Sequence, residues 1–131
     1  MIHDEICTYE VAKLAKEKGF RETVGWYYNT NGLNLLKRGC NGGNPNLING
    51  LYSAPTQSLL QRWLREEKKL HIDIVATASG YCWVIDETNG TSITDSDVLN
   101  RFTNDDSGRF DTYELSLEDA LKYALENLVL L

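Results

Sequence analysis

Cationic and hydroxyl side chains gather around one glycine- and asparagine-rich stretch, residues 37–51, and the start of the helix expected after it. Lys37 and Arg38 open the stretch, and the first turn of the following helix offers free backbone N–H groups that favour an anion. The stretch lacks Walker spacing, so an ordinary loop before a capped helix is the alternative. The expected ligand-binding residues are Lys37, Arg38, Tyr52, Ser53, Thr56, Gln57 and Arg62.

Nucleophilic catalysis requires a Cys or Ser within hydrogen-bond reach of a base. The chain has two histidines, His3 and His71, and His71 is expected to face solvent near the start of a strand. Cys82 lies inside a predicted strand, where a cysteine behaves as a small hydrophobe. No Gly-x-Ser-x-Gly motif is present. The sequence therefore predicts no catalytic residue, and an enzyme of unknown reaction is a secondary alternative.

Potential metal ligands occur in two places. His3, Asp4, Glu5 and Cys7 are close in sequence, but no Cys-x-x-Cys or His-x-x-x-His motif accompanies them. The aspartates between residues 95 and 106 lack the glycine and terminal glutamate of a calcium loop, so a solvated acidic loop is the better interpretation. We predict no metal and no cofactor.

Composition limits the class of protein. The chain has 131 residues, 42% of them hydrophobic, which fits a single domain spanning 1–131. The net charge of −6 argues against nucleic acid as a partner, because phosphate-backbone binding depends on clustered Lys and Arg. Three cysteines without paired spacing, and no signal peptide, predict the reducing cytoplasm of a host cell. No apolar run approaches the roughly 20 residues that a membrane span requires.

The first part of the chain predicts a helix and a hairpin. Thr8 is suited to cap a helix that runs to about Lys18, and Gly19 to end it in a left-handed conformation, with Phe20 completing the cap. Residues 23–36 alternate as a β-hairpin around a type I′ turn at 31–32. Alternation sends Tyr27 to the face opposite Trp26, which predicts an open, partly aromatic face.

The central helix is expected to begin with Ser53 as N-cap and Pro55 in its first turn. One face of this helix collects the apolar residues Leu59, Leu60, Trp63 and Leu64. Because that face should be buried, these four residues are expected to serve the core and not a site.

The last part of the chain predicts strands and a final helix. Strands are expected over 70–75 and 81–85 with a turn at 79–80, then over 91–94 after a turn at 89–90. An exposed excursion over 95–108 precedes a last strand at 109–115. Ser116 and Asp119 have the spacing of a capping box for the final helix. Residues 128–131 are apolar, and we expect them to dock on the domain or on a second copy in a homo-oligomer.

The resulting order is α-ββ-α-ββββ-α. Tight turns make the paired strands antiparallel, so the prediction is an α+β fold of two layers, with three helices on an antiparallel sheet built from β-hairpins.

Three blocks, Ile6–Phe20, Ser53–Glu66 and Tyr113–Leu121, resemble a small protein family encoded by phages and mobile elements of Bacteroides-type gut bacteria. The blocks cover less than half of the chain. The resemblance implies a phage or prophage accessory gene and transfers no catalytic or binding residue.

Three functions are compatible with these observations. The leading hypothesis is a non-enzymatic accessory protein that binds a partner protein or ligand, because catalytic motifs are missing and aromatic residues are abundant on predicted strands. The second is an anti-defence sponge that sequesters a small anionic ligand, a host nucleotide signal, at the site around Lys37 and Thr56. The third is a small enzyme, which would need an acidic group or histidine with a perturbed pKa in a pocket.

Overall fold

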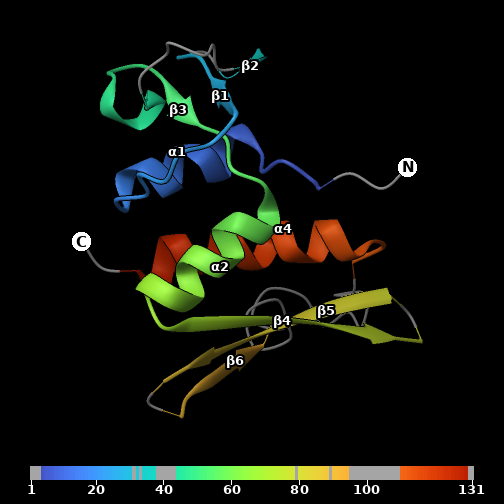
Figure 1. The fold of residues 1–131 in the computed structure, drawn as a ribbon. Coiled ribbons are helices and arrows are strands. Elements are labelled where there is room, and N and C mark those ends of the chain that lie inside the picture. Colours follow the sequence, from blue (N-terminus) through green and yellow to red (C-terminus); the bar gives the residue numbers. More distant parts are fainter. Residues whose placement is uncertain are drawn as a thin grey trace.

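The protein is seen in a computed structural model that describes residues 4–30, 32, 34–37, 44–78, 80–88, 90–94 and 110–129. Figure 1 shows a small sheet at the top, helix α1 beneath it, helices α2 and α4 side by side in the middle, and a second sheet at the bottom. Several predictions lie outside the described residues: those for His3, Arg38, the excursion 95–108 and the terminal residues 130–131.

Helix α1 (Tyr9–Glu17) begins and ends as predicted. The Thr8 hydroxyl accepts a hydrogen bond from the Val11 N–H, and Gly19 has a φ of +96°. The Phe20 N–H donates to the Ala15 carbonyl at 2.9 Å, which closes the C-terminal cap. The buried side chain of Phe20 then joins the core, and this fixes the direction in which the chain leaves the helix.

The N-terminal sheet has the strand order β2-β1-β3 and is antiparallel. Its strands are β1 (Trp26–Tyr28), β2 (Leu35–Lys37) and β3 (Tyr52–Ser53). The hairpin is confirmed, but the prediction of a two-residue type I′ turn is wrong, because Tyr28 pairs with Leu35 and six residues lie between them. Gly32 instead allows the chain to pass close to the Tyr9 ring, since a Cβ at this position would lie 2.5 Å from the ring.

The segment between β2 and β3 includes a 3₁₀ turn, η1 (Pro45–Leu47), which protects the outer edge of β3. The buried Asn46 side chain accepts a hydrogen bond from the Ser53 N–H at 2.7 Å and donates one to the Phe20 carbonyl at 2.7 Å. A single amide thus satisfies main-chain groups from two segments, which holds the turn against the sheet.

Helix α2 (Gln57–Glu67) begins later than predicted, with Thr56 and not Ser53 as its N-cap. The Thr56 hydroxyl accepts from the Leu59 N–H at 3.2 Å. The preceding residues are extended because they pair with other segments: the Ala54 N–H donates to the Trp26 carbonyl, and the Pro55 carbonyl accepts from the Cys7 N–H. Strand pairing with distant residues therefore displaces the helix start that the local sequence favours.

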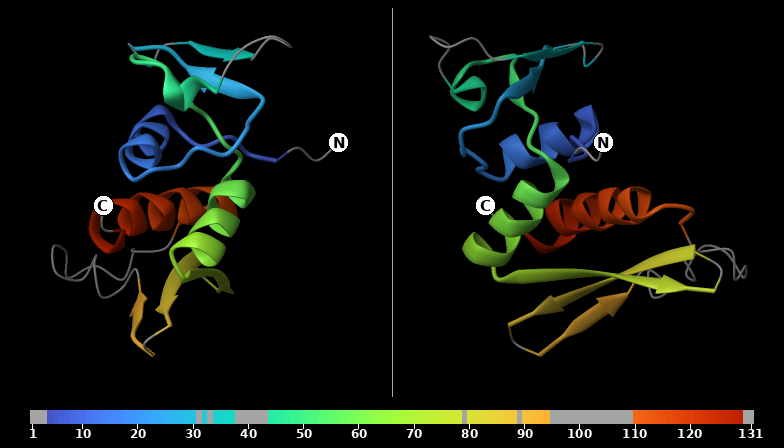
Figure 2. Two further views of the ribbon diagram at one scale, coloured as in Figure 1. Left: turned by 60° about the vertical axis from the view of Figure 1, so that its left-hand side comes forward. Right: turned by 45° about the vertical axis from the view of Figure 1, so that its right-hand side comes forward.

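The C-terminal sheet has the order β4-β5-β6 and is antiparallel, with strands β4 (Leu70–Thr77), β5 (Gly80–Glu87) and β6 (Ser92–Thr94). Both predicted hairpins are confirmed by the register, in which Thr77 pairs with Gly80 and Asp86 with Ser92. The inner face of this sheet is covered by α2 and α4 (Figure 2). That face carries the buried residues Leu70, Ile72, Trp83 and Ile85.

Helix α4 (Tyr113–Tyr123) starts earlier than predicted and continues into a π-helical turn, η2 (Ala124–Leu128). Its N-cap is Thr112, so the prediction of a capping box that begins at Ser116 is wrong. Ser116 is fully buried, and the Asp119 carboxylate accepts a hydrogen bond from the Trp83 indole N–H at 2.8 Å. The last predicted strand is reduced to Phe110, which forms a single bridge with Tyr81.

The α+β class is confirmed, and the order of the elements matches the prediction approximately: β3 was not predicted, and among the described residues three strands instead of four follow α2. In the described part of the chain, however, the strands form two separate sheets, because α2 intervenes between β3 and β4 and the helices fill the space between the sheets. The buried apolar side chains of α1, α2, α4 and the C-terminal sheet form one cluster. None of the described helices is both long and apolar enough to traverse a lipid bilayer.

Candidate functional site

Those predicted anion-binding residues that the structure describes do not converge on one point. Lys37 is exposed on β2, at the edge of the N-terminal sheet. Tyr52 contacts the Tyr9 ring edge-on, and Lys16 places its Nζ 4.9 Å from the centre of the Tyr52 ring. The Lys16 ammonium also donates to two loop carbonyls, at 2.7 and 2.8 Å, so it ties α1 to the segment before β3.

The other predicted residues have structural partners. Ser53 is buried in β3, and its hydroxyl donates to the Asn44 side chain at 3.3 Å. Thr56 caps α2. Arg62 lies on the exposed side of α2 and pairs with Glu66 at 3.1 Å. An exposed i,i+4 pair of this kind stabilises a helix by only about 0.3–0.5 kcal/mol, so it identifies no site.

Gln57 belongs to a polar cluster where the N-termini of α1, α2 and α4 meet, here called the helix junction: Thr8, Gln57, Glu114 and Glu118. The Glu118 carboxylate accepts from the Thr8 N–H at 3.0 Å and the Thr8 hydroxyl at 2.8 Å. Its other oxygen accepts from the Gln57 amide at 2.9 Å, and the same amide nitrogen donates to the Glu114 carbonyl at 2.9 Å. Glu118 thus joins three helices through one side chain.

Hollows lie on both sides of the helix junction and are lined by acidic residues. One has a volume of about 380 Å³ and includes Glu5, Glu114 and Glu118 in its lining. A smaller one, of about 180 Å³, includes Asp4, Glu5 and Glu114. The start of α2, where we predicted an anion, is therefore surrounded by carboxylates that repel one. In addition, the Gln57 N–H already donates to the Glu5 carbonyl at 2.7 Å.

Cys7 lies beside the helix junction and is fully buried. Burial raises the pKa of the Cys7 thiol far above its ordinary value, and the nearby Glu118 carboxylate raises that pKa further. Since the thiolate is the reactive form of cysteine, Cys7 is a core residue and no nucleophile.

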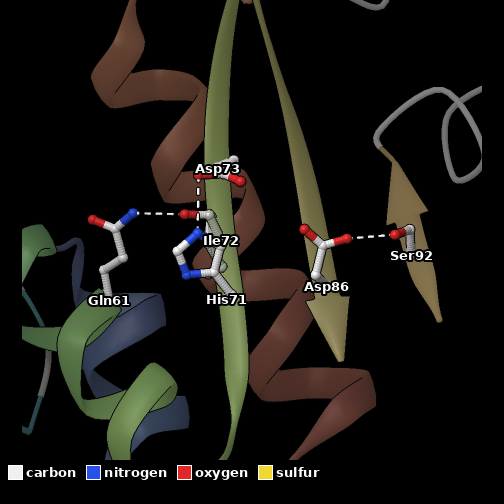
Figure 3. A network of polar contacts seen from close by, with 6 residues as sticks. All are labelled: Gln61, His71, Ile72, Asp73, Asp86 and Ser92. Carbon is white, nitrogen blue, oxygen red and sulfur yellow. Dashed lines mark hydrogen bonds and ion pairs between the residues drawn. The ribbon is translucent and has the colours of Figure 1, made fainter. Parts of the chain in front are cut away.

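A second polar group lies on the C-terminal sheet (Figure 3). The His71 imidazole and the Asp73 carboxylate, two residues apart on β4, lie 3.1 Å apart, and the Ser92 hydroxyl on β6 donates to Asp86 on β5. The Ser92 hydroxyl therefore has a carboxylate and not the histidine as its partner. This arrangement lacks the activated nucleophile of a hydrolase. Among the described residues, no three His, Cys, Asp or Glu side chains gather closely enough to hold a metal ion.

Figure 3 also shows Gln61 of α2, whose amide donates to the Ile72 carbonyl on β4 at 2.9 Å. This contact, like those of Glu118 and Lys16, was not predicted from the sequence. Each joins residues that are distant along the chain or belong to different elements, and no motif marks such a pair.

Exposed apolar side chains are concentrated in the N-terminal sheet and the turn beside it. Trp26 is 38% exposed and Leu47 68% exposed, which is unusual for large apolar side chains. The register places Trp26 and Leu35 on the same face of the hairpin and Leu36 with Tyr27 on the other. These exposed residues, here called together the N-terminal apolar surface, lie on both faces of the hairpin and on the turn η1 beside it: Trp26, Leu35, Leu36, Leu47 and Ile48.

No family model, curated protein or solved structure matches the chain. The function must therefore be inferred from the geometry of the residues themselves. That geometry offers an exposed apolar surface at the N-terminal sheet and, among the described residues, no assembled catalytic group.

Proposed function

We propose that the protein is a non-enzymatic accessory protein of a phage or mobile element, and that it acts by binding a partner protein through the N-terminal apolar surface. The observation that supports this proposal is the exposure of Trp26, Leu35 and Leu36 on the hairpin and of Leu47 and Ile48 at the turn η1. A soluble domain loses free energy by leaving such residues in water, at roughly 25 cal/mol per Å². A partner that covers them recovers that free energy.

Trp26 is the expected centre of the interface. Tryptophan is enriched among the residues that dominate binding energy, and its replacement by alanine in such a position costs about 2 kcal/mol or more. Tyr28 and Tyr52, which lie on the same face of the sheet as Trp26, pack against Tyr9 of α1. This packing holds the hairpin in place, so the surface is preorganised for a partner.

The sponge for a nucleotide signal is not favoured by the site. Glu5, Glu114 and Glu118 line the hollow next to the start of α2, where their negative charge disfavours a phosphate, and Tyr52 is held between Tyr9 and Lys16. Stacking of a base on Tyr52 would require displacement of these contacts.

The proposal is tested by recovering the partner and measuring its affinity. Tagged protein would be purified from cells that carry the gene, and the partner that co-purifies would be prepared separately and titrated against the wild-type chain. Trp26→Ala should weaken binding by about 30-fold or more, because 2 kcal/mol corresponds to that ratio.

The matched control is Leu115→Ala, since Leu115 is 54% exposed but lies on α4, away from the N-terminal sheet. This variant should bind like the wild type. A partner whose affinity falls equally with both variants, or with neither, would show that the N-terminal apolar surface is not the binding site.

A further inference from the structure

Strand β4 forms one border of the C-terminal sheet and is its longest open edge. Among the described residues, the order β4-β5-β6 leaves one side of β4 without a neighbouring strand. β4 has eight residues, whereas β2 and β6 have three each and β3 has two. Short edges resist pairing with another chain, but a long one is a template for it. In Figures 1 and 2, α2 lies over the first part of β4 and the β4–β5 turn lies at the far end.

The hairpin register determines which main-chain groups face this open edge. Thr77 pairs with Gly80 across a two-residue turn, so the N–H and C=O groups of Thr77 and of every second residue before it point to β5. Those of Ile72, Ile74 and Ala76 therefore point outward. The hydrogen bond from Gln61 to the Ile72 carbonyl agrees with this assignment, because Gln61 lies outside the sheet.

The two halves of β4 differ in their protection. In the first half, Gln61 occupies the Ile72 carbonyl, and the exposed His71 and Asp73 supply polar or charged side chains. The second half, Ile74–Thr77, has no charge and no proline, and Val75 is 43% exposed. Charges, prolines and side-chain caps are the devices that prevent edge pairing. On β4, Gln61 caps the Ile72 carbonyl, and Asp73 is the last charged residue of the strand.

We propose that the second half of β4 pairs antiparallel with the same segment of a second copy of this chain, to give one continuous six-stranded sheet. Ile74 then lies opposite Ala76 of the second copy, and each pair exchanges two main-chain hydrogen bonds. Val75 lies opposite its own equivalent on the two-fold axis, in a non-hydrogen-bonded pair whose Cα atoms are about 4.5 Å apart and whose side chains touch.

This register follows from the groups that are free. A shift that places Ile74 opposite itself would need the Ile72 carbonyl, which Gln61 occupies. A shift that places Ala76 opposite itself would bring Ile74 opposite residue 78, which is in the turn. Only the register centred on Val75 uses all four open groups of Ile74 and Ala76 and leaves Gln61 in place.

Charge and side-chain chemistry favour a second copy as the occupant. In the Val75-centred register, Asp73 lies opposite Thr77, and the two Asp73 residues are four positions apart, about 14 Å at 3.4 Å per residue. That separation exceeds the Debye length of about 8 Å in physiological salt, so their repulsion is screened. Neutral β-branched and small side chains then face each other along the whole paired segment.

The first experiment measures the mass of the full chain in solution by light scattering, at concentrations up to about 1 mM, since an edge contact of this length belongs to the weak class of interfaces. We expect the mass to rise from 14.9 kDa for one chain toward twice that value. Val75→Lys should raise the dissociation constant at least about tenfold, because it places two like charges on the axis. The control is His71→Lys, which changes an exposed side chain on the same strand and the same face as Val75. His71 lies outside the segment that pairs with the second copy, so this variant should associate like the wild type.

The second experiment measures amide exchange by NMR and reports the pairing directly. The N–H groups of Ile74 and Ala76 should be protected at high concentration and exchange rapidly at low concentration, whereas the Val75 N–H, bonded to β5, should be protected at both. Ala76→Pro removes one outward donor without touching the β4–β5 ladder and should abolish the concentration dependence.

A chain that stays monomeric at about 1 mM, a concentration at which even a weak interface should form, would overturn the proposal. Association without any change in the amide exchange of Ile74 and Ala76 would also overturn it. Association that survives both Val75→Lys and Ala76→Pro would overturn it as well. Trp26→Ala should leave the dimer intact, so this result is independent of the partner-binding surface. Circular dichroism of each variant establishes that it is folded.

Discussion

Glu118 should stabilise the fold more than any other exposed or half-buried carboxylate on α4, because it is the side chain that links α1, α2 and α4. The change to consider is Glu118→Gln, which keeps the shape of the side chain and removes its charge. One oxygen of Glu118 accepts two hydrogen bonds from Thr8 and the other accepts one from Gln57. An amide presents only one acceptor oxygen, so whichever way it turns, its NH₂ group meets a donor.

The size of the loss follows from these contacts. A hydrogen bond to a charged acceptor contributes about 1.5–3 kcal/mol, and at least one is lost. The negative charge next to the N-terminus of α1 contributes about 0.3–1 kcal/mol more. Glu118 is half-buried, so water compensates part of this loss, and we expect the free energy of unfolding to fall by about 2–3 kcal/mol.

The assay is urea unfolding followed by circular dichroism, with the urea dependence of the free energy compared between variants. The control is Glu114→Gln, which makes the same charge change one turn earlier on α4. Glu114 contributes its main-chain carbonyl to the helix junction, and its side chain makes no hydrogen bond to any described residue. The control should cost no more than about 1 kcal/mol, from the helix dipole alone. Equal losses for the two variants would refute the role assigned to Glu118.

Three further predictions concern the core. Because burial raises the pKa of the Cys7 thiol, this cysteine should resist alkylation in the folded protein at pH 8 and react only after denaturation, as mass spectrometry of its peptide would show; rapid labelling of folded protein would contradict this. Gly32→Ala should lower the melting temperature, because φ is +70° and the new Cβ would lie 2.5 Å from the Tyr9 ring; the left-handed angle alone costs about 1–2 kcal/mol. Trp83→Phe should cost about 1–3 kcal/mol in urea unfolding, because it leaves the buried side of Asp119 without its donor; wild-type stability would argue against that hydrogen bond.

Local signals in the sequence predicted the fold well where the structure is also local. Thr8 and Gly19 mark the two ends of α1, as predicted, because each cap involves residues within the same turn. The β4–β5 hairpin was predictable because its alternation and its turn lie in one short segment. In these elements the sequence pattern and the tertiary structure favour the same conformation.

The errors occurred where a distant segment competes with a local signal. Ser53 has the chemistry of an N-cap, but it pairs with Tyr27 of β1, and this pairing shifts the start of α2 to Gln57. Ser116 stands in a capping box, but α4 starts at Tyr113 and buries Ser116 in its interior face. Neither outcome can be derived from neighbouring residues, because each depends on long-range pairing and burial.

The candidate sites show the same division. Strand alternation predicted an open, partly aromatic face on the hairpin but not which residue it exposes; Trp26 is exposed, although it lies on the same face as Tyr28, which packs against Tyr9 of α1. The anion site was inferred from Lys37, Arg38 and the first turn of α2, without Glu5, Glu114 and Glu118, which the fold brings to the hollow beside that turn. Electrostatics at a helix end depends on neighbours that come from other parts of the chain.

The position of α4 has a consequence for biosynthesis. This helix packs against α1, α2 and both long strands of the C-terminal sheet, and together with η2 it buries Leu117, Leu121 and Leu125 there. A ribosome makes α4 and η2 after every other described element, and at about 5–20 residues per second the stretch from Thr94 to Val129 takes roughly 2–7 s. Throughout that interval, α4 is missing, and the apolar sides of α1, α2 and the C-terminal sheet that it later covers are exposed to solvent. The growing chain, more than the finished protein, is therefore the species most exposed to aggregation.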